Sequence, residues 1–393
     1  MNIVYTDNNA TTRVADEVIS EMMPYLGQLY GNPSSMHTFG GQVGQNVKQA
    51  RQQVADLIGA DPDEIVFTSC GTESDNSAIY SALAALPERK HLVTSNVEHP
   101  AILNLFAHLE KKQGYTVTYV PVDKKGRLDL DRLYDAVSSE TAVVSLMWAN
   151  NETGVIFPIQ EIAGRIKDSG ALFHTDAVQA AGKVAIDVNA AGVDMLSMSG
   201  HKLHAPKGIG CLYIRKGLKF SPFLIGGHQE KGRRGGTENT SSIIGFGKAC
   251  ELARSNLNEM NTRVKALRDY LEAGLLEKIP GAHVNGDTDN RLPNTLSIGF
   301  EAVEGESVLL MLDRDGICAS SGSACTSGSL DPSHVLMAME VPIKTAHGSI
   351  RFSLSHYNTR EDMDHIIKSM VPVIDRLRQM SPFWKDGKMV QAQ

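Results

Sequence analysis

Two residues that could carry chemistry lie directly after predicted strands of this chain. Lys202 ends the run Asp194–Lys202, in which an apolar strand passes into small polar residues and then presents one amine. Burying a cation there is costly, unless the amine is uncharged and condenses with an aldehyde. Asp176 ends a second apolar run, 171–176. An amine and a carboxylate at strand ends are the pattern of a Schiff-base site for pyridoxal phosphate (PLP), whose pyridine nitrogen the carboxylate keeps protonated.

Cys325 is the second candidate nucleophile. It lies in the segment 319–333, which is rich in serine and glycine and has Leu330 as its one large apolar side chain. Such a segment cannot bury a face, so we expect a mobile, exposed loop. An exposed thiol is a liability unless reactivity is its task. With Lys202, it points to carbon–sulfur chemistry; an incidental loop thiol is the alternative.

The segment 69–74, Ser-Cys-Gly-Thr-Glu-Ser, joins a predicted strand to a predicted helix. Backbone amides and hydroxyls at a helix N-terminus suit a phosphate, because the unpaired N–H groups and the helix dipole both favour an anion. The alternative is an ordinary cap, in which Thr72 or Ser74 satisfies the first turn. The Walker spacing is absent, which disfavours a nucleotide triphosphate.

Further polar side chains accompany the same strand ends. Gln179 follows Asp176 by three residues and could donate a hydrogen bond to the PLP phenolate, although Asp176 as a simple turn cap is the alternative. His201 and His204 have no acidic or thiol partner at metal-ligand spacing, which disfavours a metal there.

Two basic side chains complete the candidate site. His99 follows the predicted strand 91–95, where an imidazole could stack on a cofactor ring and shuttle protons. Arg351 lies in the alternating run 349–355, and its guanidinium could grip a substrate carboxylate through two hydrogen bonds. An ordinary surface histidine and a surface ion pair are the alternatives.

The elements that must position these residues alternate between strands and helices over the first two-thirds of the chain. The strand candidates are 64–69, 91–95, 117–122, 141–148, 171–175, 193–198 and 210–215. Helical patterns lie between most of them, such as 75–86 and 158–167. This order predicts an α/β fold with a mostly parallel seven-stranded sheet, covered by helices on both faces. Ligands of such sheets bind at the carboxyl ends of the strands.

The pattern changes near residue 255. Leu257 opens a long amphipathic helix that leads into a smaller α+β domain, with strands at 294–300 and 348–354 and a helix at 360–378. We therefore expect a large PLP-binding domain over residues 15–255. The small domain would comprise residues 1–14 and 256–393, with the cysteine loop 319–333.

Composition excludes several functional classes. The chain has 393 residues, a net charge of −7 and no run rich in lysine or arginine, so we expect no nucleic-acid partner. No apolar stretch approaches the length of a membrane span, and the N-terminus lacks the pattern of a signal peptide. The five cysteines form no CxxC pair and suggest neither disulfides nor zinc. We expect a cytoplasmic protein without membrane contact.

Five motifs resemble, in order, those of the PLP-dependent cysteine desulfurases with a long cysteine loop. The resemblance covers residues 5 to about 380 and rests on Asp7-Asn-Asn-Ala-Thr-Thr12, Gly31-Asn-Pro-Ser-Ser35, Gly71-Thr-Glu-Ser-Asp-Asn76, Ser199-Gly-His-Lys202 and Ser321-Gly-Ser-Ala-Cys325-Thr-Ser327. Two more runs, Gly226-Gly-His-Gln-Glu230 and Arg233-Arg-Gly-Gly-Thr-Glu-Asn239, resemble the nitrogenase-associated (NifS-like) branch.

The resemblance implies a fold-type I PLP-dependent transferase, similar to the class V aminotransferases, that works as a homodimer. Lys202 would then hold PLP as a Schiff base, Asp176 would pair with the pyridine nitrogen, and His99 would stack on the ring. The remaining implied contacts are Gln179 with the phenolate, Asn151 beside the ring, Gly71, Thr72, Ser199 and His201 with the phosphate, Thr237 of the partner subunit also with the phosphate, and Asn32 and Arg351 with the substrate carboxylate.

The implied reaction converts L-cysteine to L-alanine and leaves a persulfide on Cys325, with Lys202 and His99 as the other catalytic residues. Its sulfur would supply iron–sulfur cluster assembly, for nitrogenase maturation, through a scaffold protein. A transient contact of Cys325 with a cluster, through the persulfide, is compatible with this role. The alternatives are an aminotransferase or a selenocysteine lyase on the same fold. An iron–sulfur scaffold is disfavoured because one accessible thiol provides too few ligands.

Overall fold

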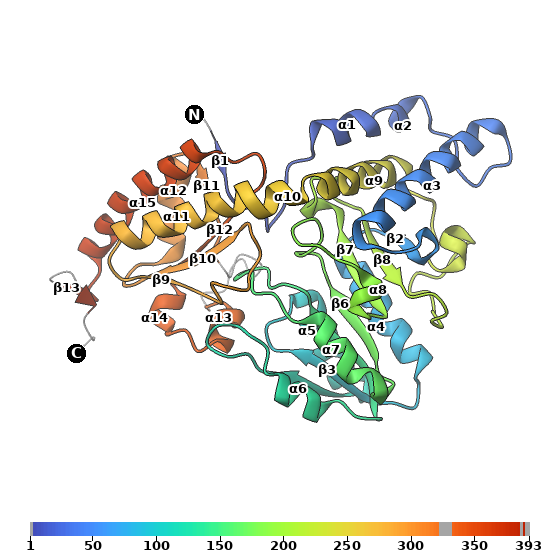
Figure 1. Ribbon diagram of the computed structural model, residues 1–393, viewed down its shortest axis with the longest axis horizontal. Helices are drawn as coiled ribbons and strands as arrows, with labels where there is room; N and C mark the ends of the chain where they lie inside the picture. The colour runs from blue at the N-terminus through green and yellow to red at the C-terminus, as the bar shows by residue number, and fades with distance from the viewer. Residues whose placement is uncertain (1–2, 322–331, 386–387, 390–393) are drawn as a thin grey trace.

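A seven-stranded sheet forms the centre of the larger part of the molecule (Figure 1). The computed structural model describes residues 3–321, 332–385 and 388–389, so most of the predicted cysteine loop, including Cys325, lies outside the described residues. The strands are β2 (Ile65–Thr68), β3 (His91–Ser95), β4 (Thr116–Val120), β5 (Thr141–Met147), β6 (Leu172–Asp176), β7 (Met195–Ser199) and β8 (Gly210–Ile214).

The strand order is β2-β8-β7-β6-β5-β3-β4. Every neighbouring pair is parallel except those of β8, which runs antiparallel to both β2 and β7. The predicted mostly parallel seven-stranded sheet is therefore confirmed. Because most strands share one direction, their carboxyl ends meet along one edge, where ligands bind in such sheets.

Helices cover both faces of this sheet, and the alternation of side chains along each strand explains how. In β2, Ile65 and Phe67 pack into one core, whereas Val66 packs into the other. The first core also receives α3 (Thr38–Ile58), α7 (Ile159–Ile166) and α9 (Thr240–Ser255). The second receives α4 (Gly71–Ala85) and α5 (Pro100–Gln113). The remaining helices of this part are α1 (Asp16–Met22), α2 (Pro24–Gly27), α6 (Leu130–Ala136) and α8 (Val188–Ala191).

Helix α4 begins at Gly71, four residues before the predicted start at Asp75. Its first turn is formed by polar residues, and the Ser74 amide already donates to the Cys70 carbonyl. The apolar face of α4 begins only at Ala78 and Ile79, so the spacing of apolar residues could not indicate where the helix starts. The difference matters because it places the helix N-terminus directly at the end of β2.

The smaller part of the molecule is built on the three-stranded antiparallel sheet β12-β10-β9. Its strands are β9 (Ala282–Val284), β10 (Thr295–Phe300) and β12 (Ser349–Ser353), and β1 (Val4–Tyr5) pairs with β11 (Ile317–Cys318) beside them. Its helices are α10 (Leu257–Glu259), α11 (Lys265–Lys278), α12 (Gly305–Arg314), α13 (His334–Ala338), α14 (Ile343–Ala346) and α15 (Arg360–Met380).

One apolar core holds this smaller part together. Leu271 of α11, Phe300 of β10 and Ile374 of α15 belong to it, and so does Val4 near the N-terminus. The chain therefore returns its first strand to the C-terminal elements. The domain boundary near residue 255 stays a prediction. No helix within the described ranges is both long enough and apolar enough to cross a membrane.

Candidate active site

A cavity of about 320 Å³ opens at the carboxyl ends of the central strands. Asp176 is the last residue of β6, Ser199 is the last of β7, and Met147 is the last of β5. The residues around it are Asn9, Ala10, Cys70, Gly71, Thr72, Asp75, His99, Met147, Ala149, Asn151, Asp176, Val178, Gln179, Ser199, His201, Lys202 and Arg351. Ten of the residues predicted from the sequence therefore lie around one cavity, which is why neither His99 nor Arg351 is an incidental surface residue.

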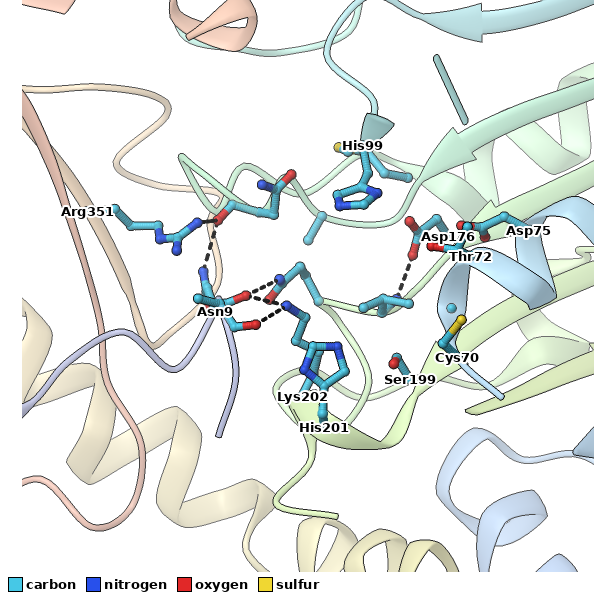
Figure 2. A pocket seen from close by; sticks show the side chains of 17 residues that line it. Asn9, Cys70, Thr72, Asp75, His99, Asp176, Ser199, His201, Lys202 and Arg351 are labelled. Atoms are coloured by element: carbon cyan, nitrogen blue, oxygen red, sulfur yellow. Dashed lines mark hydrogen bonds between the residues drawn. The ribbon is translucent and has the colours of Figure 1, made fainter. Parts of the chain in front are cut away.

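One end of the cavity is formed by the N-terminus of α4 and by Ser199 (Figure 2). Cys70, the N-cap residue, makes no side-chain hydrogen bond to the first turn within the described chain. The buried Ser199 hydroxyl likewise has no hydrogen-bond partner among the described residues. A Cβ atom at Gly71 would lie 2.8 Å from Cγ2 of Val178, so glycine keeps this end open. An uncapped helix N-terminus beside an unused hydroxyl fits a phosphate group.

The opposite end of the cavity carries Arg351, from β12 (Figure 2). Its guanidinium is buried and donates to Asp7 Oδ1 at 2.9 Å and to the Asn151 carbonyl at 3.0 Å. Its Nε atom is buried and has no partner among the described residues. Arg351 thus presents a fixed cation, part of whose charge Asp7 balances, at a place suited to a carboxylate.

Asp176 lies between the two ends and is buried. Its Oδ1 atom accepts a hydrogen bond from the Val178 amide at 2.9 Å. Burial raises the pKa of Asp176, and the neighbouring His99 and Lys202 oppose that rise. The two basic groups therefore favour a charged carboxylate here, as contact with a protonated pyridine nitrogen requires.

Asp75 is a second buried acid beside this cavity, and the sequence reasoning missed it. Burial, and then the charge of Asp176, raises the pKa of Asp75 well above its ordinary value. His174, 3.6 Å away, cannot compensate, because burial lowers its own pKa to about 3 and leaves it neutral. Burial and the charge of Asp176 thus favour the protonated form of Asp75, whereas His99 and Lys202 favour the charged form of Asp176.

Lys202 follows β7 in the short turn Gly200–Lys202. Its Nζ atom donates to the carbonyl oxygens of Asn9 and Ala10, both at 2.7 Å. Figure 2 shows the amine below the middle of the cavity, across from His99. A planar group between the two side chains would meet an amine on one side and an imidazole on the other.

His99 caps the helix that follows it, α5. Its Nδ1 atom accepts a hydrogen bond from the Ala101 amide at 3.1 Å, which assigns the proton of the neutral ring to Nε2. Burial lowers the pKa of His99, an effect that Asp176 opposes and Lys202 strengthens. In its neutral form His99 therefore acts as a hydrogen-bond donor through Nε2.

Three predicted site residues do not line the cavity. Asn32 is exposed, and its side chain accepts a hydrogen bond from the Ser34 amide at 2.9 Å. Thr237 is also exposed and lies outside the cavity of its own chain. Cys325 lies outside the described residues.

The sequence pattern gave no role to Asn9, Cys70 or Lys183, which lie at the cavity or bond to residues that line it. Asn9 and Cys70 line the cavity. Lys183 lies four residues beyond Gln179, in the turns that follow β6, and its amine donates to the Gln179 side-chain oxygen. The spacing of four residues was the signal for Lys183, whereas the position of Asn9 depends on a contact across most of the chain. The described residues contain no group of three or more His, Cys, Asp or Glu side chains that could hold a metal ion.

Comparison with known proteins agrees with this geometry. Residues 4–366 match the family model for aminotransferase class-V. The chain is 58% identical to the cysteine desulfurase of Trichormus azollae over 386 residues, covering 98% of this chain and 96% of that protein. It is also 58% identical to the cysteine desulfurase NifS of Azotobacter vinelandii over 389 residues, covering 99% and 96%.

A solved structure of a NifS-like protein superposes with a TM-score of 0.89 at 38% identity, covering 95% of this chain and 100% of that one. The chain belongs to the aminotransferase class-V family, and within it to the cysteine desulfurases. Enzymes of this group depend on PLP.

Proposed function

We propose that this protein is a cysteine desulfurase that converts L-cysteine to L-alanine and transfers the sulfur to Cys325 as a persulfide. One observation carries the proposal beyond the family: a single cavity places the Lys202 amine and the Asp176 carboxylate between an open helix N-terminus and the Arg351 guanidinium. These groups match an aldehyde cofactor with a phosphate, together with an amino-acid substrate that bears a carboxylate.

The residues present fit PLP. Ser199 and the first turn of α4 would hold the phosphate, with Thr72 and His201 beside them. Asp176 would face the pyridine nitrogen, Gln179 the phenolate, Asn151 the edge of the ring and His99 its face. Lys202 would bind the aldehyde. When bound, the ring supplies an electron sink that stabilises negative charge at the substrate α-carbon.

The protein's own side chains then have separate roles in binding the substrate, moving protons and accepting sulfur. Arg351 binds the substrate carboxylate and orients the α-carbon toward Lys202. The Lys202 amine takes the α-proton, and His99 holds or returns a proton at Nε2. The Cys325 thiolate accepts the substrate sulfur. L-Cysteine and the Cys325 thiol together become L-alanine and a persulfide on Cys325, so no outside oxidant or reductant is needed.

The proposed enzyme works as a homodimer and delivers its sulfur to another protein. Thr237 of the partner subunit would reach the phosphate in a homodimer, which accounts for its exposed position outside the cavity of its own chain. Asn32 would join Arg351 at the substrate carboxylate. We propose a cytoplasmic enzyme that passes sulfur to an iron–sulfur scaffold protein, for nitrogenase maturation, with transient contact between Cys325 and the cluster.

The test compares Cys325→Ala with Cys318→Ala, a control in β11 that is not one of the catalytic or cofactor-binding residues proposed above. Cys325→Ala should abolish alanine formation from L-cysteine while the visible absorbance of bound PLP persists. Cys318→Ala should retain activity. An aminotransferase would keep its activity in both variants. The proposal fails if the unaltered protein yields neither alanine nor labile sulfur on the peptide that contains residue 325.

A further inference from the structure

Lys183 is a buried amine behind the cavity, and both hydrogen bonds shown for it go to side-chain amide oxygens. Its Nζ atom donates to Oε1 of Gln179 at 2.8 Å and to Oδ1 of Asn9 at 3.3 Å. No carboxylate pairs with it among the described residues. A lysine without an acidic partner is costly to bury, so its retention calls for a reason.

The bond from Lys183 to Gln179 bears on which way the Gln179 amide faces. An amide group presents an oxygen at one end and a nitrogen at the other, and either end can be turned toward a given neighbour. Because Lys183 is a donor, the Gln179 oxygen faces it; the Asn9 oxygen accepts from Lys183 and also, at 3.2 Å, from the Asn294 amide nitrogen. The Gln179 nitrogen then donates to the Asn9 carbonyl at 2.9 Å, and its second N–H remains for the cavity that Gln179 lines.

Asn9 connects the same cluster to Lys202. Its carbonyl accepts from the Lys202 amine at 2.7 Å, as the dashed lines in Figure 2 show. Its side-chain nitrogen donates to Thr295 Oγ1 at 2.9 Å and to the Asn151 carbonyl at 3.2 Å. Asn9 thus meets Lys202 through its backbone carbonyl, while its side chain contacts β10 at Thr295.

The electrostatic surroundings of Lys183 are consistent with an uncharged hydrogen-bond donor. Burial, followed by the charges of Lys202 and Arg351, lowers the pKa of Lys183 well below its ordinary value. The neutral amine that this favours still has two N–H groups, which is the number its two bonds require. Lys183 can therefore donate to both amide oxygens without adding a full positive charge beside Lys202.

We propose that Lys183 is a positioning residue, which turns the Gln179 nitrogen toward the ring oxygen of the cofactor and toward the Asn9 backbone carbonyl that holds the Lys202 amine. This inference rests on the proposed function. Without Lys183, the Gln179 amide can turn its oxygen toward the cavity, where it would repel the ring oxygen that it otherwise stabilises. The electronic state of the bound cofactor should then change, which a side chain that only packs the core would not cause.

The experiment follows the visible absorbance of the PLP-loaded protein as a function of pH in Lys183→Met, which keeps the length of the side chain but removes the donor. The control is Lys112→Met, an exposed lysine at the end of α5. We expect the midpoint of the absorbance titration to shift by about one pH unit in Lys183→Met, comparable to one lost hydrogen bond, and to stay unchanged in the control. We also expect kcat to fall more than KM changes.

A double-mutant cycle separates orientation from packing. In a Gln179→Met background the amide is absent, so Lys183→Met should cause little further shift of the midpoint. An unchanged midpoint in the single variant, or an equal shift in both backgrounds, would overturn the inference. So would a failure of both Lys183→Met and Lys183→Gln to fold, because Lys183 would then serve core stability. If the unaltered protein shows no cofactor absorbance, the proposed function fails instead.

Discussion

At the scale of single residues, burial sets the charge of the acids around the cavity. Glu98 precedes His99 and is fully buried. Its Oε1 atom accepts from Ser95 Oγ at 2.6 Å and from the Met147 amide at 3.1 Å. Burial raises the pKa of Glu98 to about 8, although both hydrogen bonds oppose this. Glu98 is therefore protonated at neutral pH and adds no charge next to Asp176.

Stability should depend on pH through Glu98. The folded protein holds this proton up to about pH 8, whereas the unfolded chain releases it near 4.5. The stabilising contribution is thus complete below pH 4.5 and is lost as pH rises toward 8. Glu98→Gln removes this dependence. Between pH 5.5 and 8.5, the free energy of unfolding of the unaltered protein should fall by about 3 kcal/mol relative to the variant.

Denaturant unfolding of the PLP-loaded proteins at the two pH values measures this difference. Glu110→Gln, an exposed change in α5, serves as the control and should follow the unaltered protein. A constant difference between Glu98→Gln and the unaltered protein at both pH values would show that Glu98 is ionised when folded.

At the scale of elements, the junction between β2 and α4 creates the phosphate end of the cavity. Strand β2 ends at Thr68, and α4 begins only three residues later at Gly71. The Glu73 carboxylate stabilises the junction, because it accepts from the Ser69 amide at 2.8 Å and pairs with Arg234 at 2.9 Å. A rigid junction of this kind keeps the first amides of the helix directed at one place.

Gly71→Ala should disturb this junction. The added methyl group would lie 2.8 Å from Val178 Cγ2, and Val178 follows β6 directly after Asp176 and Ala177. We expect a loss of about 1–3 kcal/mol in the free energy of unfolding and roughly tenfold weaker retention of PLP. Both are measurable by denaturant unfolding and by equilibrium dialysis of the cofactor.

The matched control is Gly164→Ala in α7, where an added Cβ meets nothing within 4 Å. There the change should stabilise the protein by about 0.5–1 kcal/mol, because alanine is the better helix former. If Gly71→Ala retained PLP as the unaltered protein does, the phosphate end would lie elsewhere.

At the scale of the whole molecule, a band of exposed apolar side chains runs along α1, α2 and the segment after them. Leu26 is 63% exposed and Tyr30 is 71% exposed, and Ile19 and Met23 accompany them. Figure 1 shows α1 and α2 at one edge of the larger part, beside α9. Exposed apolar bands of this kind mark association surfaces, which agrees with the proposed homodimer.

Leu26→Glu combined with Tyr30→Glu should therefore weaken the dimer. Sedimentation equilibrium should show a dimer dissociation constant at least about tenfold higher, because each substitution would place a charge in an apolar interface. Leu310→Glu, in α12 of the smaller part, replaces another exposed leucine and should leave the dimer intact. A monomeric unaltered protein, or an unchanged dimer in the double variant, would contradict this surface.

The sequence alone determined the seven strands and two residues suited to carry chemistry: Asp176 at the end of one strand and Lys202 just after another. Both follow from local pattern, because an apolar run with a polar residue after it needs no distant partner to be recognised. The parallel direction of the strands then implied that these ends meet. The start of α4 at Gly71 was missed, since the first turn of a helix carries no apolar period.

Only the tertiary structure decided which distant residues complete the cavity. Asn9 contacts Gln179 and Thr295, which lie far along the chain, and Arg351 meets Asp7 from the opposite end. Such pairs depend on how strands and helices are ordered in space, and no local spacing encodes them. The raised pKa of Asp75 has the same origin, because burial and a neighbouring carboxylate, rather than residue type, cause it.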